Sequence, residues 1–252
     1  MTHRLIVLGS SNAVPNAAHD NTHLLLVGTG RAILIDAPGS PLRRLDAAGF
    51  NPLDLTDVIV THFHPDHVSG LPLLLMDLWL LGRTQPLRIY GLDYTIDRIE
   101  RMLDLYDWQD WPNFFPLLFH RLPEREQTPV LDSPEVRILS SPTQHFIPSI
   151  GLRIEFPETQ RAVAYSSDTE PCPQMVRLAA QVDVLIHEAA GKRTGHSSPE
   201  QAGEIARQAQ AKSLMLIHYP TWGGRSADLQ SRAQSTFDGL VLVAEDFLQL
   251  TF

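Results

Sequence analysis

The stretch Thr61-His62-Phe63-His64-Pro65-Asp66-His67 places three imidazoles and a carboxylate within a few residues of one another. It follows residues 57–60, an apolar and β-branched run that predicts a buried strand. In an extended backbone His62 and His64 project from the same side, so both can bind one ion. Neutral imidazole and carboxylate are ligands that zinc and similar divalent metals prefer, so the stretch predicts a metal site.

The second half of this stretch changes direction. Pro65 ends the strand, and we expect Asp66 and His67 to lie near the start of a helix that begins around Gly70. That turn can direct both side chains toward a second ion beside the first. The alternative, a solvated polar loop, fits less well because metal sites select these residue types at such tight spacing.

Three further residues with metal-binding side chains occur where predicted strands end. His145 comes after the run 136–139, Asp168 after 162–165 and His218 after 213–217. An α/β framework presents functional side chains at such positions. Taken alone, each residue fits a capping or surface role, but together with the opening stretch they favour a two-metal site.

Composition limits the class of protein. The chain has 252 residues, of which 43% are hydrophobic and 19% charged, so we expect one domain spanning residues 1–252. No apolar run reaches the ~20 residues of a membrane helix, and the N-terminal apolar stretch is too short for a signal peptide. The single cysteine fits a reducing compartment, so we predict a cytoplasmic protein with no membrane partner. The net charge of −9 gives no support for an extended basic nucleic-acid surface.

Strands and helices alternate along the whole chain. Apolar runs bounded by turn residues predict strands over 5–8, 24–27, 32–36, 57–60, 87–90, 136–139, 151–156, 162–165, 182–186, 213–217 and 240–243. Helical patterns cover 41–48, 71–81, 94–106, 174–180 and 199–210. Many strands with interspersed helices in one long domain predict an α/β fold, a four-layer αββα sandwich with two mixed sheets flanked by helices.

The aromatic segment Trp108–Phe115 has three interpretations. It can be a loop packed against the core, a lid over the site or an oligomer contact, because exposed aromatic clusters tend to mark such surfaces. The first is favoured, and the third leads us to consider a homodimer.

The motif His-x-His-x-Asp-His resembles the signature of the metallo-β-lactamase fold superfamily, and the later ligand candidates match as well. The resemblance implies two divalent metal ions, with zinc expected and manganese or iron as alternatives. It implies that His62, His64 and His145 hold the first metal, that Asp66, His67 and His218 hold the second, and that Asp168 bridges them. A hydroxide shared by the two ions would then attack the substrate, oriented by a hydrogen bond to Asp66.

Four shorter segments resemble the ribonuclease Z and phosphodiesterase branch of this superfamily. They are Leu8-Gly9-Ser10-Ser11, Ser166-Ser167-Asp168-Thr169, His187-Glu188-Ala189-Ala190 and Gly195-His196-Ser197-Ser198. In that branch a histidine matching His196, paired with an acid matching Glu188, supplies or steers the proton of the leaving group. We expect both residues in loops between the strand 182–186 and the next helix. The alternative for His196 is a neighbour of a helix N-cap at Ser197 or Ser198.

One departure from ribonuclease Z bears on the substrate. Many of those proteins carry a long tRNA-binding arm between the positions of His145 and Asp168, whereas this interval has room only for two strands and a turn. We therefore predict a small phosphodiester substrate, a cyclic nucleotide or a short RNA end. The alternatives are tRNA 3′-end cleavage, hydrolysis of a lactone, thioester or sulfate ester on the same metals, and a non-catalytic metal-binding scaffold.

Overall fold

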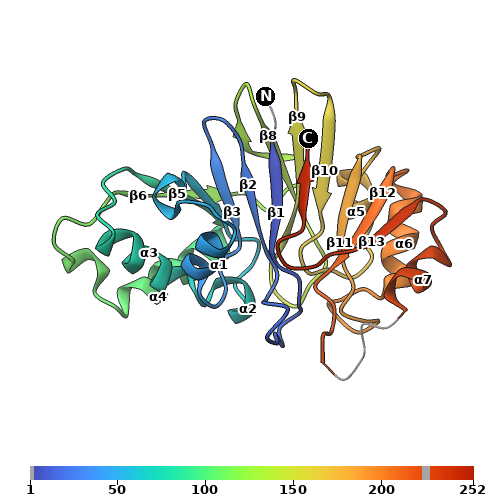
Figure 1. Ribbon diagram of the computed structural model, residues 1–252, viewed down its shortest axis with the longest axis horizontal. Helices are drawn as coiled ribbons and strands as arrows, with labels where there is room; N and C mark the ends of the chain where they lie inside the picture. Colours follow the sequence, from blue (N-terminus) through green and yellow to red (C-terminus); the bar gives the residue numbers. More distant parts are fainter. Residues whose placement is uncertain (1–2, 223–227) are drawn as a thin grey trace.

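The computed structural model describes residues 3–222 and 228–252. Two seven-stranded sheets pack face to face, with helices on both outer sides (Figure 1). The first sheet has the order β14 (Gln249–Thr251), β1 (Arg4–Gly9), β2 (His23–Val27), β3 (Ala32–Ile35), β4 (Asp57–Ile59), β5 (Leu87–Leu92) and β6 (Leu117–Leu122). The second has the order β13 (Leu240–Val243), β12 (Ser213–Ile217), β11 (Val184–Glu188), β10 (Arg161–Tyr165), β9 (Ile150–Phe156), β8 (Arg137–Pro142) and β7 (Thr128–Asp132).

Both sheets are mixed. In the first sheet β3, β4, β5 and β6 run parallel, while β14, β1 and β2 pair antiparallel. In the second sheet β10 to β13 run parallel and β7 to β10 antiparallel. The parallel halves matter for function, because the carboxyl ends of parallel strands meet at one edge, where an α/β fold presents its functional loops.

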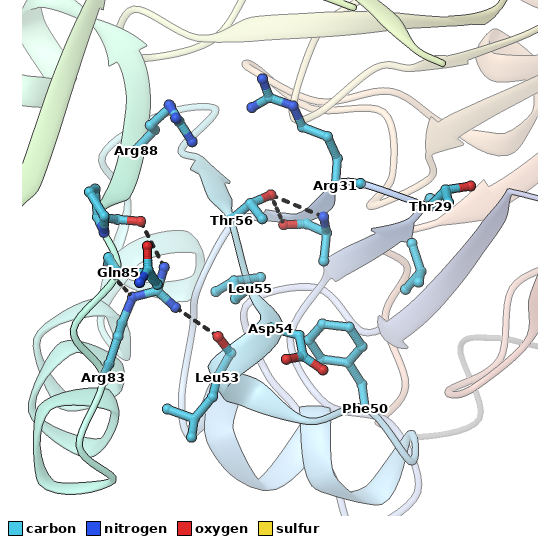
Figure 2. Close-up of a pocket in the computed structure, with 15 residues that line it drawn as sticks. Thr29, Arg31, Phe50, Leu53, Asp54, Leu55, Thr56, Arg83, Gln85 and Arg88 are labelled. Carbon is cyan, nitrogen blue, oxygen red and sulfur yellow. Dashed lines mark hydrogen bonds between the residues drawn. The ribbon is translucent and has the colours of Figure 1, made fainter. Parts of the chain in front are cut away.

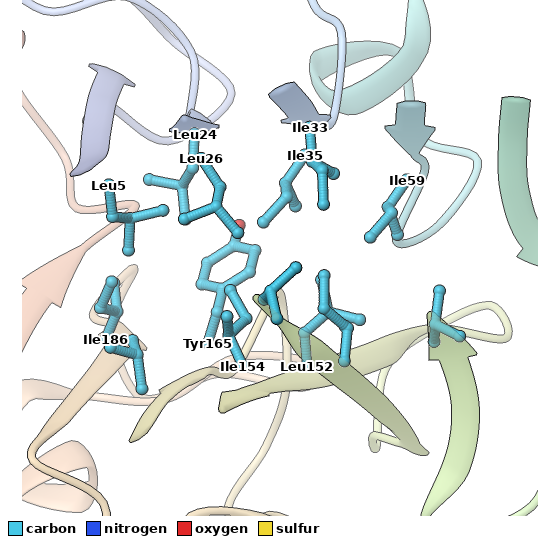
Figure 3. Close-up of a cluster of buried hydrophobic side chains, with 14 of the residues drawn as sticks. Leu5, Leu24, Leu26, Ile33, Ile35, Ile59, Leu152, Ile154, Tyr165 and Ile186 are labelled. Carbon is cyan, nitrogen blue, oxygen red and sulfur yellow. The ribbon is translucent and has the colours of Figure 1, made fainter. Parts of the chain in front are cut away.

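The alternation of side chains along the strands produces three apolar layers. In β1, Leu5 and Val7 face the other sheet, whereas Ile6 and Leu8 face the helices. Figure 3 shows the inner layer, in which side chains from the first sheet meet Leu152, Ile154 and Tyr165 of the second. Strands buried on both faces explain why their sequences are continuous apolar runs.

The helices complete the sandwich. The first sheet carries α1 (Pro41–Ala47), α2 (Pro65–Val68), α3 (Leu71–Leu80) and α4 (Asp93–Asp104), with the short 3-10 turns η1 (Pro52–Asp54) and η2 (Trp108–Asp110). The second sheet carries α5 (Pro173–Leu178), α6 (Pro199–Gln208) and α7 (Leu229–Gln234). This is the αββα sandwich expected from the sequence. In the part of the chain that the structure describes, every helix is too short or too polar to cross a bilayer.

The structure differs from the sequence-based expectations in three respects. Strands β6, β7 and β14 and helix α7 were not predicted. Residues 65–68 form a separate turn of helix ahead of α3, rather than only leading into it. Glu188 does not lie in a loop as expected: it is the last residue of β11 and pairs with Ile217. The polar side chains of His187 and Glu188 concealed the end of this strand, although both are fully buried.

The aromatic segment packs on the helical layer. Phe115 is buried in the cluster that lies between the first sheet and its helices. Trp111 stacks on Trp79 of α3 with ring centroids 5.2 Å apart, and Trp79 Nε1 donates a hydrogen bond to the Pro112 carbonyl. The segment is therefore a loop packed against the core, and the homodimer stays a prediction.

Candidate metal centre

The potential metal ligands meet where loops leave the carboxyl ends of strands in both sheets. His62 and His64 follow β4, and Asp66 and His67 lie in α2. The second sheet contributes residues after β8, β10 and β12. These are His145, Asp168 and His218. The structure thus brings together all seven residues that the sequence suggested as ligands.

The first group of potential ligands is formed by three histidines. The His64 Nδ1 atom lies 3.1 Å from His62 Nε2 and 3.0 Å from His145 Nε2. The Asp168 Oδ2 atom lies 3.8 Å from the Nε2 atoms of both His62 and His145. Three ring nitrogens so close around one point match the ligand set of a tetrahedral zinc ion.

The second group lies on the other side of Asp168. Its Oδ1 atom is 3.5 Å from His67 Nε2 and 3.4 Å from His218 Nε2. The Asp66 Oδ2 atom completes the group, 3.4 Å from His218 Nε2 and 3.7 Å from His67 Nε2. The two oxygens of Asp168 therefore face different groups, as a carboxylate that bridges two cations requires.

Unpartnered buried atoms show that these residues fit divalent cations. The His67 Nε2 and Asp168 Oδ1 atoms are buried and accept no hydrogen bond from any described residue. A buried polar atom without a partner costs roughly 1–3 kcal/mol. A cation between them would remove this cost, and the imidazole and carboxylate donors suit zinc.

A buried carboxylate that the sequence analysis missed orients His67. The Nδ1–H of His67 donates to Asp36 Oδ2 over 2.8 Å, and both side chains are fully buried. Thr61 holds the same carboxylate through its backbone N–H and its hydroxyl group, at 2.8 and 2.9 Å. With its proton on Nδ1, His67 presents the lone pair of Nε2 to the second group. Asp36 follows the apolar strand β3, the same signal that identified Asp168 and His218.

The histidines of the first group are oriented in the same way. His145 Nδ1 lies 2.7 Å from the Gly195 carbonyl oxygen, to which it donates, so its Nε2 lone pair points inward. His62 Nδ1 lies 3.1 Å from Thr61 Oγ1, which in turn accepts a hydrogen bond from Ser167 Oγ. Fixed ring orientations of this kind prepare a site for a metal before it binds.

Three of these positions have a left-handed backbone. The φ angles are 63° at Asp36, 52° at Ser167 and 53° at His218. Side chains other than glycine rarely adopt this region, and each instance costs of order 1 kcal/mol. This left-handed conformation turns the chain sharply where each strand ends. The side chains at these positions are thereby directed toward the candidate metal centre.

His196 and Glu188, which the sequence analysis predicts as a proton-transfer pair, lie next to Asp168. His196 Nδ1 is 2.9 Å from Glu188 Oε1 and 3.9 Å from Asp168 Oδ2. Glu188 is fully buried and also accepts hydrogen bonds from the backbone N–H groups of Thr169 and Ala190. The N-cap expected beside His196 is Ser198, which forms a capping box with Gln201 at the start of α6. His196 is therefore a neighbour of the cap, and it also makes the hydrogen bond to Glu188.

Burial and neighbouring charges shift the pKa values in the centre. Burial lowers the pKa of His145 to about 4. Burial raises the pKa of Glu188 to about 8, with the charge of Asp168 acting in the same direction. Burial alone would raise the pKa of Asp66, but the hydrogen bond to His218 and the charge of His67 lower it to about 2. A neutral His145 and an ionised Asp66 at neutral pH are the forms that bind a cation.

A separate hollow on the first sheet is not part of this centre. It has a volume of about 530 Å³ and contains Arg31, Arg83 and Arg88 (Figure 2). The guanidinium group of Arg83 donates to three backbone carbonyls, and Arg31 pairs with the buried Asp57 at 3.0 Å. These contacts occupy the guanidinium groups of Arg31 and Arg83. The hollow therefore does not offer them to a ligand in the way that the metal centre offers its imidazoles and carboxylates.

Comparisons with known proteins agree with this geometry. The family model described as β-lactamase superfamily domain matches residues 31–219. A ribonuclease Z from Mycobacterium sp. (strain KMS) is 30% identical over 95% of this chain and 93% of its own length. The crystal structure of the metallo-β-lactamase fold protein YhfI from Bacillus subtilis has a TM-score of 0.84, with 23% identity and all of both chains covered. Human tRNase Z, short form, has a TM-score of 0.81, with 24% identity and 98% of both chains covered.

The alignment with the mycobacterial protein also bears on the expected absence of a long arm between His145 and Asp168. It spans 269 positions, more than the 252 residues of the whole chain, so that relative contains residues without a counterpart here. Between His145 and Asp168 the structure has only the hairpin of β9 and β10, joined by residues 157–160. The expectation that no arm is inserted at this place is confirmed.

Proposed function

This chain belongs to the β-lactamase superfamily, and on that premise we propose that it is a metal-dependent hydrolase that cleaves phosphodiesters with two divalent cations. The observation that carries the proposal is the position of Asp168, whose two oxygens each face a separate group of ligand atoms. A scaffold protein has no need of the additional buried pair of His196 and Glu188, so we favour an enzyme.

The residues have distinct roles in this proposal. The ligands are His62, His64 and His145 for one cation, Asp66, His67 and His218 for the other, and Asp168 for both. Bound cations of this kind activate water and offset the negative charge of the attacked phosphoryl group. Asp66 accepts a hydrogen bond from the attacking water and orients it. His196 would give the proton on Nε2 to the leaving oxygen while its Nδ1 takes the proton that Glu188 carries because of its raised pKa.

The substrate we propose is a small phosphodiester, a cyclic nucleotide or a short RNA end. The short β9–β10 hairpin supports this choice, because it leaves no extended arm at that place to hold a folded RNA. Cleavage at the 3′ end of tRNA precursors is the second candidate, favoured by the name of the mycobacterial relative. We propose zinc as the metal, since the ligand set is rich in imidazole, and manganese or iron as alternatives.

The test is hydrolysis of bis(p-nitrophenyl) phosphate. Zinc-, manganese- and iron-loaded samples would be compared with a chelated sample and with the Asp66→Asn variant. Asp46→Asn, which changes an exposed residue of α1, is the matched control. We expect turnover that is lost on chelation, falls at least a hundredfold in Asp66→Asn and is retained in Asp46→Asn.

Two results would count against the proposal. A folded protein with two bound metals and no turnover would direct attention to lactones, thioesters and sulfate esters. Turnover of tRNA precursors but not of small diesters would instead favour the second candidate.

A further inference from the structure

A second cavity adjoins the proton-transfer pair of the candidate metal centre. It has a volume of about 470 Å³, within the range of pockets for small ligands. Three loops line it, and two of them continue directly from a part of the centre. Ala190 and Arg193 lie between Glu188 and His196, Pro220 to Trp222 follow His218, and Asn12 to Val14 follow β1. The backbone N–H of His196 donates to the Arg193 carbonyl at 3.0 Å, which joins the pocket wall to the catalytic histidine.

The walls of this cavity are fixed by hydrogen bonds between loops. Trp222 Nε1 donates to the Pro15 carbonyl at 2.8 Å, and Asn16 Nδ2 donates to the Thr221 carbonyl at 3.2 Å. The hydroxyl groups of Ser11 and Thr221 lie 3.0 Å apart. The cavity is therefore a built feature, not a chance gap between independent loops.

Trp222 offers an aromatic surface at the cavity. Its side chain is 59% exposed, although the bond to Pro15 holds the indole ring in place. An exposed, immobilised indole ring is the surface on which nucleic-acid-binding proteins stack a base, and it costs little ordering entropy when a ligand arrives.

Arg193 supplies the charge. It is exposed, and its guanidinium makes no ion pair or hydrogen bond with the residues that the structure describes. Among the residues that line the cavity it is the one with a charged side chain. A free guanidinium and an aromatic ring that line the same cavity suit a ligand that combines a planar ring with a phosphate group.

We infer that this cavity is a nucleotide subsite, in which the base stacks on Trp222 and a phosphate group pairs with Arg193. The inference rests on the proposed function and makes it more specific, because it selects diesters that contain a nucleoside. Stacking involves the flat face of the base, which all bases have. The cavity therefore accepts more than one base.

The test compares two ligands that differ only in the base. Adenosine 5′-monophosphate and ribose 5-phosphate would be titrated by calorimetry into the zinc-loaded protein. We expect adenosine 5′-monophosphate to bind about fivefold more tightly or better, the low end of what one base stack contributes. Trp222→Ala should remove the difference while leaving ribose 5-phosphate binding in place, and Trp222→Phe should keep most of it.

Two further variants separate the alternatives. Arg193→Ala should weaken both ligands by a similar factor, whereas Arg101→Ala, which removes an exposed arginine from α4, should change neither. Phe146 is a competing aromatic surface, since it is 60% exposed and 5.1 Å from the His145 ring. Loss of base discrimination in Phe146→Ala but not in Trp222→Ala would overturn the inference.

The nucleotide subsite and the proposed hydrolase activity can be refuted independently of each other. Equal binding of the two ligands, in a protein that hydrolyses bis(p-nitrophenyl) phosphate, would refute the subsite and leave the hydrolase standing. Base discrimination that depends on Trp222, in a protein that hydrolyses no diester, would refute the proposed hydrolase and leave a nucleotide-binding site.

Discussion

The carboxylate of Asp36 and the imidazole of His67 form a fully buried hydrogen bond of 2.8 Å, although Asp36 follows β3 and His67 lies in α2. Because Thr61 donates twice to the same carboxylate, Asp36 cannot rotate away. The charges of Asp168 and Asp36 outweigh burial and hold the pKa of His67 well above its usual range, so a cation bound at Nε2 would displace the proton from that nitrogen and leave the one on Nδ1. Asp36 thus fixes the ring that we propose as a ligand of the second cation.

Replacing Asp36 by Asn should weaken metal binding by 10- to 100-fold, the usual effect of losing an orienting partner behind a metal-bound histidine. The reason is that an amide lacks the charge that fixes the proton on Nδ1 of His67. Competition with a chelator of known affinity measures the change, with Asp46→Asn as the control. Unchanged affinity in a folded Asp36→Asn protein would show that His67 needs no such support.

Replacing Gly195 by Ala should damage the first group of ligands as well as the backbone. Gly195 has a φ angle of 76°, its carbonyl accepts the His145 hydrogen bond, and a Cβ atom there would lie 2.7 Å from Phe146. Gly82→Ala is the matched control, because its φ angle is 81° and a Cβ atom would meet nothing within 4 Å. We expect Gly82→Ala to lower the free energy of unfolding by about 1 kcal/mol, and Gly195→Ala to lower it further and also weaken metal binding. Equal effects of the two variants on both readouts would contradict this.

Replacing Ser198 by Ala should lower the free energy of unfolding by about 1 kcal/mol. The side chain of Ser198 accepts a hydrogen bond from the Gln201 N–H, and the Gln201 Oε1 atom accepts one from the Ser198 N–H. Ser40 occupies the corresponding position of α1 but makes no such bond, so Ser40→Ala should change the stability little. Urea titration of both variants provides the measurement, and a loss of similar size in Ser40→Ala would argue against the capping role.

His187 should make the protein less stable in mild acid. Burial lowers its pKa from 6.5 to about 4, and its Nε2 atom has no hydrogen-bond partner among the described residues. The unfolded chain therefore binds the proton more readily than the folded protein. The stabilisation is complete above pH 6.5 and is lost between pH 6.5 and 4, by about 1.4 kcal/mol per pH unit.

The His187→Phe variant isolates this contribution. Urea unfolding at pH 7.5 and 5.5, with a chelator present to remove metal effects, should show a smaller loss in the variant than in the wild-type protein. The comparison uses the change with pH, so a general loss of stability in the variant does not affect it. The same loss in both proteins would assign the acid sensitivity to other groups, such as His23, whose pKa burial also lowers to about 4.

Much of the fold was predictable because its strands are buried on both faces and its helices on one. The runs 24–27 and 213–217 coincide with strands, because continuous apolar residues have few other stable arrangements. The edge strand β14 was missed for the opposite reason. Gln249–Thr251 is largely exposed and forms a strand because it pairs with β1, at the other end of the chain. A three-residue segment carries no local signal of such a long-range partner.

The sequence by itself determined the chemistry of the candidate site, because the kinds of side chain and their places after apolar strands follow from local pattern. Only the tertiary structure decided how these groups are arranged. The two oxygens of Asp168 face different ligand groups because β4 and β10 belong to two sheets whose packing sets that distance. Asp36 reaches His67 because β3 and β4 are neighbours in one sheet, and Glu188 reaches His196 through the loop that follows β11. Pairing of groups far apart in the chain depends on the packing of the apolar layers between them, which no local pattern encodes.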